Sequence, residues 1–245
     1  MFSDLRWLIV PASVLAGAIA AVSGFGIGSL LTPVFMLSLP PQHAVAVLAI
    51  PHALATLVRW FRLRGDLHAP TFRQFGVASA VGGLAGALAQ ARLSGQVLTV
   101  VLALLLMLAG SSELTRRRVP LPETPFWRLF GGVLSGLFGG LVGNQGGIRT
   151  AALLGFGLTP RQIVATATAS ALLVDVARVP IYLWTAGPVI AGTAPLWGTA
   201  AIGAVLGTLI GLPVLRSVPE PIYRRLVGLL LVLLGLWLLI AALPR

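Results

Sequence analysis

Apolar residues fall into ten runs along this chain, and proline, glycine or arginine bounds each run. A crossing of the bilayer takes about 17 to 25 predominantly apolar residues, because a helix rises about 1.5 Å per residue and the hydrocarbon core is about 30 Å thick. In each half of the chain the first two runs are shorter than this, and the next three are long enough. The pattern predicts an all-α protein in which each half holds two short helices and three transmembrane helices. The runs are residues 7–22, 27–39, 43–61, 71–89, 97–114, 127–142, 148–158, 162–184, 195–212 and 222–243.

Composition places the chain in a lipid bilayer. Hydrophobic residues make up 57% of the 245 residues and charged residues only 9%, whereas a soluble domain carries about 25% charged residues. A soluble enzyme and a disordered chain are therefore excluded. The formal net charge is +11, but the cations are arginines at the ends of apolar runs, without interleaved aromatic residues. That distribution argues against nucleic acid and favours loops that face anionic lipid.

Residues that perform catalysis or bind metals are scarce. The chain has no cysteine and three histidines, so disulfides, thiolate metal sites and a histidine metal cage are not expected. Of the six acidic residues, only Asp175 lies in the middle of an apolar run. No catalytic residues, metal or cofactor are predicted, and the chain is not expected to be an enzyme.

The two halves resemble each other as copies of one unit. A shift of 119 positions aligns glycine with glycine at three places, Pro41 with Pro160 and Arg59 with Arg178. These residues are not interchangeable apolar filler, so their coincidence indicates a duplication. We therefore divide the chain into a first repeat at residues 1–114, a cytoplasmic linker at 115–126, which is rich in arginine and proline, and a second repeat at 127–245.

Arginine placement predicts how the repeats are oriented. If each repeat is a re-entrant hairpin plus three crossings, the second is inverted relative to the first, because three is odd. With Arg59, Arg149 and Arg178 set aside as intramembrane, this arrangement puts 11 arginines on one side and 3 on the other. Five full crossings per repeat give the same division, whereas a parallel model with four gives 9 to 5. Since cytoplasmic loops are enriched in arginine, the sequence favours inverted repeats, with both termini outside and the arginine triplet at 116–118 in the cytoplasm.

A glycine-rich turn joins the two short helices of each repeat. Glycine lets such a turn adopt a positive φ and lets a ligand approach the backbone, and a helix that starts there presents free N–H groups that suit an anion. In inverted-repeat transporters, half-helix ends of this kind meet near the middle of the membrane. Close helix packing is the alternative role for these glycines. The residues predicted to bind a substrate are Gly24, Gly26 and Gly28 in the first turn, and Asn144, Gln145, Gly146 and Gly147 in the second.

Charged residues within the apolar runs are the next signal, because a charge at the bilayer centre costs about 2.5–3.5 kcal/mol on insertion scales. Arg149 directly follows the second glycine turn, and Asp175 and Arg178 are one helical turn apart. Arg149 and Arg178 are predicted to face an anionic substrate. Alternatively, Asp175 and Arg178 form an ion pair that ties helices together. Arg59 is expected to reach a membrane surface with its charged end.

Hydroxyl side chains follow one stretch of the eighth run. Thr166, Thr168 and Ser170 either coordinate a substrate or bond back to their own helix, and we include Thr166 and Ser170 among the predicted binding residues. His52 follows a proline in the third run and is either a proton carrier, together with Asp175, or a packed histidine.

These features resemble the TauE/SafE sulfite exporter family. The resemblance lies in the glycine-rich turn followed by proline at positions 24–33, in the helix that opens Pro-x-x-Ala-Val at 41–45, and in their second-half counterparts Thr159-Pro160 and Ala165-Thr166-Ala167-Thr168. The run DVARVPIY at 175–182 is similar to the family's second-half helix. The second turn departs from the family pattern, because Asn144 and Gln145 interrupt its glycines and Ala152 stands where Pro33 would repeat.

The resemblance implies a multi-pass protein of the bacterial cytoplasmic membrane that exports a small anion such as sulfite, an organosulfonate or a related sulfur compound. The sequence itself leads to the hypothesis of a secondary transporter whose partners are a small anion and the lipid bilayer, with no nucleic acid. A homo-oligomer is compatible with it. The alternative is a non-transporting membrane assembly or signalling subunit, which nothing in the sequence excludes.

Overall fold

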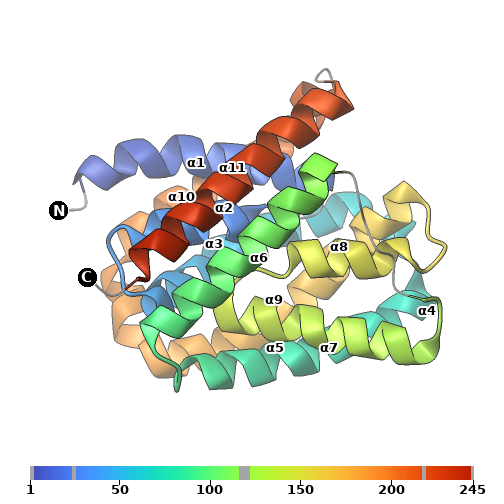
Figure 1. Cartoon of the computed structure of the whole chain (residues 1–245), viewed down its shortest axis with the longest axis horizontal. Coiled ribbons are helices and arrows are strands. Elements are labelled where there is room, and N and C mark those ends of the chain that lie inside the picture. Colours follow the sequence, from blue (N-terminus) through green and yellow to red (C-terminus); the bar gives the residue numbers. More distant parts are fainter. Residues whose placement is uncertain (1–2, 24–25, 116–121, 217–218, 244–245) are drawn as a thin grey trace.

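The computed structural model describes residues 3–23, 26–115, 122–216 and 219–243, and the regular secondary structure within these ranges is helical (Figure 1). The first half contains α1 (Ser3–Ser23), α2 (Ile27–Met36), α3 (Pro41–Leu63), the 3₁₀ turn η1 (Arg64–Asp66), α4 (Ala69–Thr71), the π-helical turn η2 (Phe72–Gly76), α5 (Val77–Gln90) and α6 (Gly95–Thr115). The second half contains α7 (Pro125–Val142), α8 (Gly146–Leu154), α9 (Pro160–Gly192), α10 (Ala194–Arg216) and α11 (Glu220–Ala241).

Several helices begin at a proline, where its fixed φ fits the first turn and its missing N–H is not needed. α3 starts at Pro41, and α7 starts at Pro125 after Thr124, whose hydroxyl accepts a hydrogen bond from the Trp127 N–H. α9 starts at Pro160 with a full capping box between Thr159 and Gln162. The helix starts are therefore encoded locally, in the residues at these boundaries.

Within the part of the chain that the structure describes, six helices are long and apolar enough to cross a membrane, and the chain is a multi-pass membrane protein. This set differs in two respects from the sequence expectation. α7 is included because proline and its threonine cap extend the helix upstream of the apolar run, to 18 residues. The predicted span at 71–89 is not among the six, although α4, η2 and α5 follow one another there without a break. The six helical segments are Pro41–Asp66, Gly95–Thr115, Pro125–Val142, Pro160–Gly192, Ala194–Gly211 and Pro221–Ala241.

Helix packing is reciprocal between the two halves. α1 packs along α10, and α7 packs along α5, which is the same relation with the halves exchanged. The third helices α3 and α9 contact each other, as do the last helices α6 and α11, which lie side by side in Figure 1. Such exchange is what two repeats related by a twofold axis produce.

Small residues let these pairs approach closely. A Cβ at Gly207 on α10 would lie 2.0 Å from the Val14 carbonyl oxygen on α1, and a Cβ at Gly136 on α7 would lie 1.8 Å from the Ser79 carbonyl oxygen on α5. The glycine ladders of α7 and α10 are therefore packing faces, as their spacing predicts.

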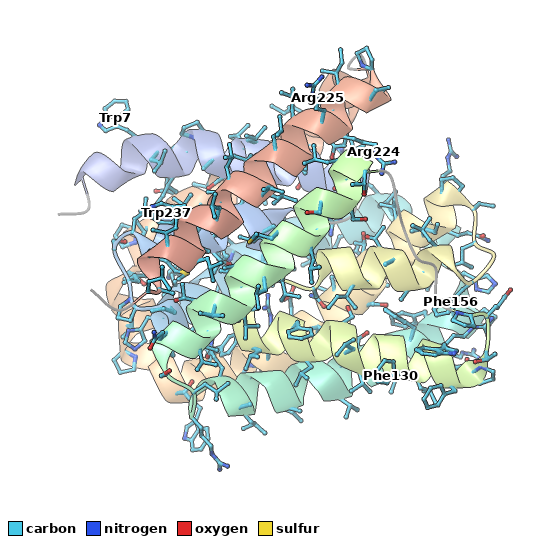
Figure 2. The ribbon with its side chains drawn as sticks, in the orientation of Figure 1. Trp7, Phe130, Phe156, Arg224, Arg225 and Trp237 are labelled. Carbon is cyan, nitrogen blue, oxygen red and sulfur yellow. The ribbon has the colours of Figure 1, made fainter. Side chains whose placement is uncertain are left out.

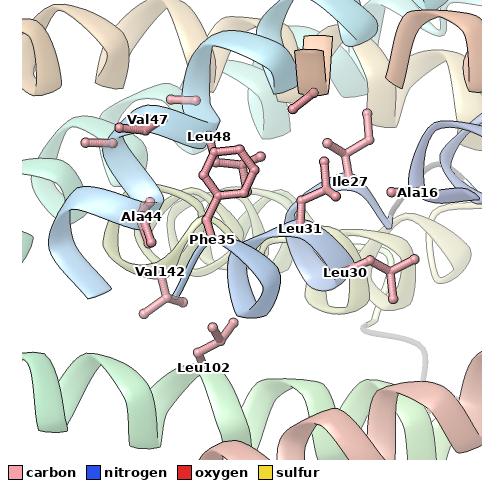
Figure 3. Close-up of a cluster of buried hydrophobic side chains, with 14 of the residues drawn as sticks. Ala16, Ile27, Leu30, Leu31, Phe35, Ala44, Val47, Leu48, Leu102 and Val142 are labelled. Carbon is pink, nitrogen blue, oxygen red and sulfur yellow. The ribbon is translucent and has the colours of Figure 1, made fainter. Parts of the chain in front are cut away.

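The short helix α2 lies inside the protein. Ile27, Leu31 and Phe35 are at most 1% exposed, and they point into a cluster formed with α3, α6 and α7 (Figure 3). A helix of 10 residues is too short to cross the bilayer, so α2 ends at membrane depth, where protein surrounds it. Gly26, which caps the start of α2, is buried with it.

Candidate functional site

The two glycine turns are in contact. Gly26 caps α2 with φ 136°, a conformation that side chains with a Cβ rarely adopt, and Gly143 ends α7 with φ 72°. A Cβ at Gly28 would lie 1.9 Å from the Gly143 carbonyl oxygen, so only glycine fits there. The Ser29 hydroxyl donates to Asn144 Oδ1 at 3.1 Å and ties the start of α2 to the turn before α8. Gly24 lies outside the described residues.

A buried polar triad links α3 to α9. Asp175 Oδ2 lies 2.7 Å from His52 Nδ1, and Asp175 Oδ1 accepts hydrogen bonds from Arg178 Nε at 2.9 Å. Arg178 also donates through Nη1 to the Gly139 carbonyl oxygen, and the Tyr182 hydroxyl donates to the neighbouring Gly140 carbonyl oxygen. Both carboxylate oxygens are therefore engaged, and α9 is fixed to the end of α7 just before the second glycine turn.

Arg59 lies in the interior as well. Its side chain is buried, with Nε donating to Thr168 Oγ1 at 2.9 Å and Nη1 donating to the Ala20 carbonyl oxygen at 2.7 Å. The expectation that Arg59 reaches a membrane surface is wrong. Its aliphatic stem runs inward because α1 ends beside it and offers the carbonyl oxygen that the guanidinium needs.

Arg149 completes a buried cluster of charge. It is 1% exposed and is close enough to Arg59, Asp175 and Arg178 for their charges to act on it. Three guanidinium groups therefore lie around the Asp175 carboxylate within the protein interior. Charged side chains at membrane depth mark binding sites and transport paths more often than simple packing, and guanidinium groups suit a compact anion.

A cavity of about 400 Å³ lies on the other side of the second glycine turn. α6 and α7 supply an apolar wall that includes Leu105 and Phe138, and the turn and α8 supply Asn144, Gln145 and Thr150. These three polar side chains are at least nine-tenths buried. Among the described residues, nothing pairs with Asn144 Nδ2, either polar atom of the Gln145 amide or the Thr150 hydroxyl. The cavity therefore presents polar groups that can hold a ligand.

The structure separates the predicted binding residues into two groups. Gly147 lines the cavity with Asn144 and Gln145 and, with Gly146, opens α8, whereas Arg149 and Arg178 belong to the charged cluster. Thr166 accepts a hydrogen bond from the His68 N–H, and the Ser170 hydroxyl lies near Gly76 in the π-helical turn. Neither of these two hydroxyl residues lines the cavity.

The sequence did not predict the His52–Asp175 contact or the inward course of Arg59. Proximity of α3 to α9 depends on tertiary packing over more than a hundred residues. One signal was present, because Arg59 and Arg178 occupy the same position in the two repeats. Among the described residues, no three His, Asp or Glu side chains gather as a metal site requires.

Buried helix breaks, an arginine-rich interior and apolar spans define the class of integral membrane transporters. The chain matches the family model described as sulfite exporter TauE/SafE over residues 9–238, and it belongs to this family. The family comprises exporters of sulfite and related sulfur compounds. No curated protein and no solved structure is similar enough to the chain to count as a match.

Proposed function

We propose that the protein is a secondary transporter that exports a small anion, either sulfite, an organosulfonate or a related sulfur compound, across the bacterial cytoplasmic membrane. The observation that carries the proposal is the buried cluster of three arginines, Arg59, Arg149 and Arg178, around Asp175. Guanidinium groups bind compact oxyanions through strong charge-assisted hydrogen bonds, so an anion that reaches this cluster is recognised by its charge.

The glycine turns give this anion a place to bind. The free N–H groups at the starts of α2 and α8, near Gly28 and Gly147, carry the positive ends of the two helix dipoles. Asn144 and Gln145 add amide donors on the cavity side. Gly26 shapes the first turn and Gly146 the second. In the transport cycle, the two repeats rock around these turns and expose them to one side of the membrane at a time.

The repeats are inverted with respect to each other in this proposal, and both termini face the outside of the cell. The reciprocal packing of α1 with α10 and of α7 with α5 supports a twofold relation. In Figure 1, the start of α1, the end of α11 and the turn between α5 and α6 lie at the left of the molecule, whereas α4 and the start of α7 lie at the right. The right-hand end is the arginine-rich, cytoplasmic one in this arrangement.

His52 and Asp175 are the groups that we propose for proton coupling. A proton held between His52 Nδ1 and Asp175 Oδ2 influences how strongly Asp175 holds Arg178, because the other carboxylate oxygen binds that guanidinium. Binding and release of this proton would then change the net charge of the His52, Asp175 and Arg178 side chains near the anion. His52→Gln is expected to abolish any stimulation of flux by an imposed pH gradient.

Flux in proteoliposomes tests the function. We expect the purified protein to catalyse flux of at least one of labelled sulfite, thiosulfate and taurine, above the rate of empty vesicles, because the buried cluster recognises a compact negative charge. Each anion is measured with and without a pH gradient and a membrane potential. A protein that is correctly inserted and monodisperse, yet moves none of these anions, contradicts the proposal.

Cysteine labelling tests the orientation, since the native chain has no cysteine. Ala91→Cys lies in the turn after α5 and Gly65→Cys in η1, and both positions are exposed. In whole cells, a thiol reagent that does not cross membranes should label Ala91→Cys, whereas Gly65→Cys should be labelled only after the cells are permeabilised. The reverse result, or equal labelling of both, rules out the proposed orientation.

A further inference from the structure

A second, partly buried ion pair lies away from the charged cluster, near the end of α6. Arg224 Nε on α11 is 3.1 Å from Glu113 Oε2 on α6, and the two side chains are 16% and 9% exposed. Figure 2 shows Arg224 where α11 passes the end of α6. α6 and α11 already pack closely through glycine, with Gly110 against Gly228. The ion pair is therefore not needed to bring these two helices together.

The ion pair stands between two cavities. The first is the 400 Å³ cavity beside Asn144 and Gln145, and the second has a volume of about 500 Å³. Glu113 and Thr150 line both, whereas Arg224 lines the second cavity together with Tyr223 and the start of α9 at Pro160. A solute that travels between the second cavity and the glycine turn therefore passes the Glu113 carboxylate.

The Thr150 hydroxyl marks the same junction. It is 8% exposed, and among the residues that the structure describes nothing pairs with it. A buried hydroxyl in that state at the wall shared by two cavities is suited to donate a hydrogen bond to a passing ligand. The junction thus holds a cation, its counter-ion and a donor.

We infer that Arg224 is a further anion-binding residue on the transport path, beside the second cavity. Glu113 is then the counter-ion that the anion displaces from Arg224. With no anion present, Glu113 neutralises Arg224 and closes the junction. An incoming anion takes the guanidinium, receives a hydrogen bond from Thr150, and then moves on to the glycine turn. Cations are rejected because Arg224 repels them. This inference rests on the proposed anion transport, since it assigns a further site on the same path.

Variants that neutralise only one of the two partners distinguish this role from a structural one, because the two should affect the flux differently. Arg224→Gln removes the cation that binds the anion and keeps the Glu113 carboxylate, which repels it, so we expect sulfite and thiosulfate flux in proteoliposomes to fall at least about tenfold. Glu113→Gln leaves the guanidinium in place, and flux should be unchanged or increased. The double variant should recover toward the rate of Glu113→Gln. Arg224→Lys, which keeps the charge, should retain most of the flux.

A pair that only joins α6 to α11 gives a different result. Both single neutral variants would then lose flux equally, the double variant would show no recovery, and Arg224→Lys would fail like Arg224→Gln. Any of these outcomes overturns the inference while the wild-type protein still transports. Absence of anion flux in the wild type is instead a failure of the proposed function. The control is the pair Glu123–Arg128, 3.0 Å apart, which lines neither of these cavities and whose neutral variants should leave flux unchanged.

Discussion

Arg149→Ala is expected to reduce anion flux to near the background of empty vesicles while the protein stays inserted and folded. The substitution removes one of the three guanidinium groups of the buried cluster and leaves Asp175 bound to His52 and Arg178. Hydrogen bonds to a charged group contribute about 1.5–3 kcal/mol, which corresponds to a decrease of roughly 10- to 100-fold in anion affinity. The fold should tolerate the change electrostatically, because the excess of like charge decreases.

Flux measured beside size-exclusion profiles in detergent checks this expectation. Arg149→Lys keeps the charge without the planar fork of donors and should retain part of the flux. Arg161→Ala, at an exposed position near the start of α9, is the matched control and should behave as the wild type. Unchanged flux in a well-folded Arg149→Ala protein would falsify the role assigned to this arginine.

Gly28→Ala is expected to destabilise the protein and to abolish transport together. The added Cβ would lie 1.9 Å from the Gly143 carbonyl oxygen, and a backbone atom cannot rotate away. Overpacking of this kind costs about 1–3 kcal/mol when the surroundings shift to relieve it. The shift must separate the two glycine turns, so the contact between Ser29 and Asn144 and the shared anion site should be lost with it.

Thermal unfolding in detergent and flux in vesicles measure the two effects separately. Gly198→Ala on α10 is the control, because an added Cβ there meets nothing within 4 Å. It should leave the flux unchanged and stabilise its helix by up to about 1 kcal/mol, the difference in helix propensity between alanine and glycine. If Gly28→Ala retains wild-type flux and melting temperature, the two turns do not form one site.

The sequence was sufficient for the parts of this protein that depend on neighbouring residues. Apolar runs predicted the helical membrane class, and the proline and threonine starts of α7 and α9 lie within two residues of the predicted run boundaries. A change of backbone geometry inside a run is a different matter. Nothing in the residues at 71–89 indicates the π-helical turn at Phe72–Gly76, because the turn forms against α7 and α9.

The sequence indicates which residues belong to the candidate site, but not which of them lie next to one another. Asn144, Gln145 and Arg149 were selected for their position after a glycine turn, and the structure places the first two against a cavity and Arg149 against a charged cluster. A helix has more than one face, and periodicity does not tell which face meets a cavity when the surroundings are apolar on all sides. Thr166 shows the same limit, since its hydroxyl accepts a hydrogen bond from His68.

By itself the sequence determined that this chain is helical and embedded in lipid, because burial of apolar length and breaks at glycine and proline are local properties. Tertiary structure alone decided that His52, Arg59, Arg149, Asp175 and Arg178 come together, and that Glu113 meets Arg224 between two cavities. The contacts of His52 with Asp175 and of Glu113 with Arg224 join residues more than a hundred positions apart. Charged groups interact strongly only where they lie close together in a low-dielectric interior. The packing of α3 on α9 and of α6 on α11 decides which of these residues do so.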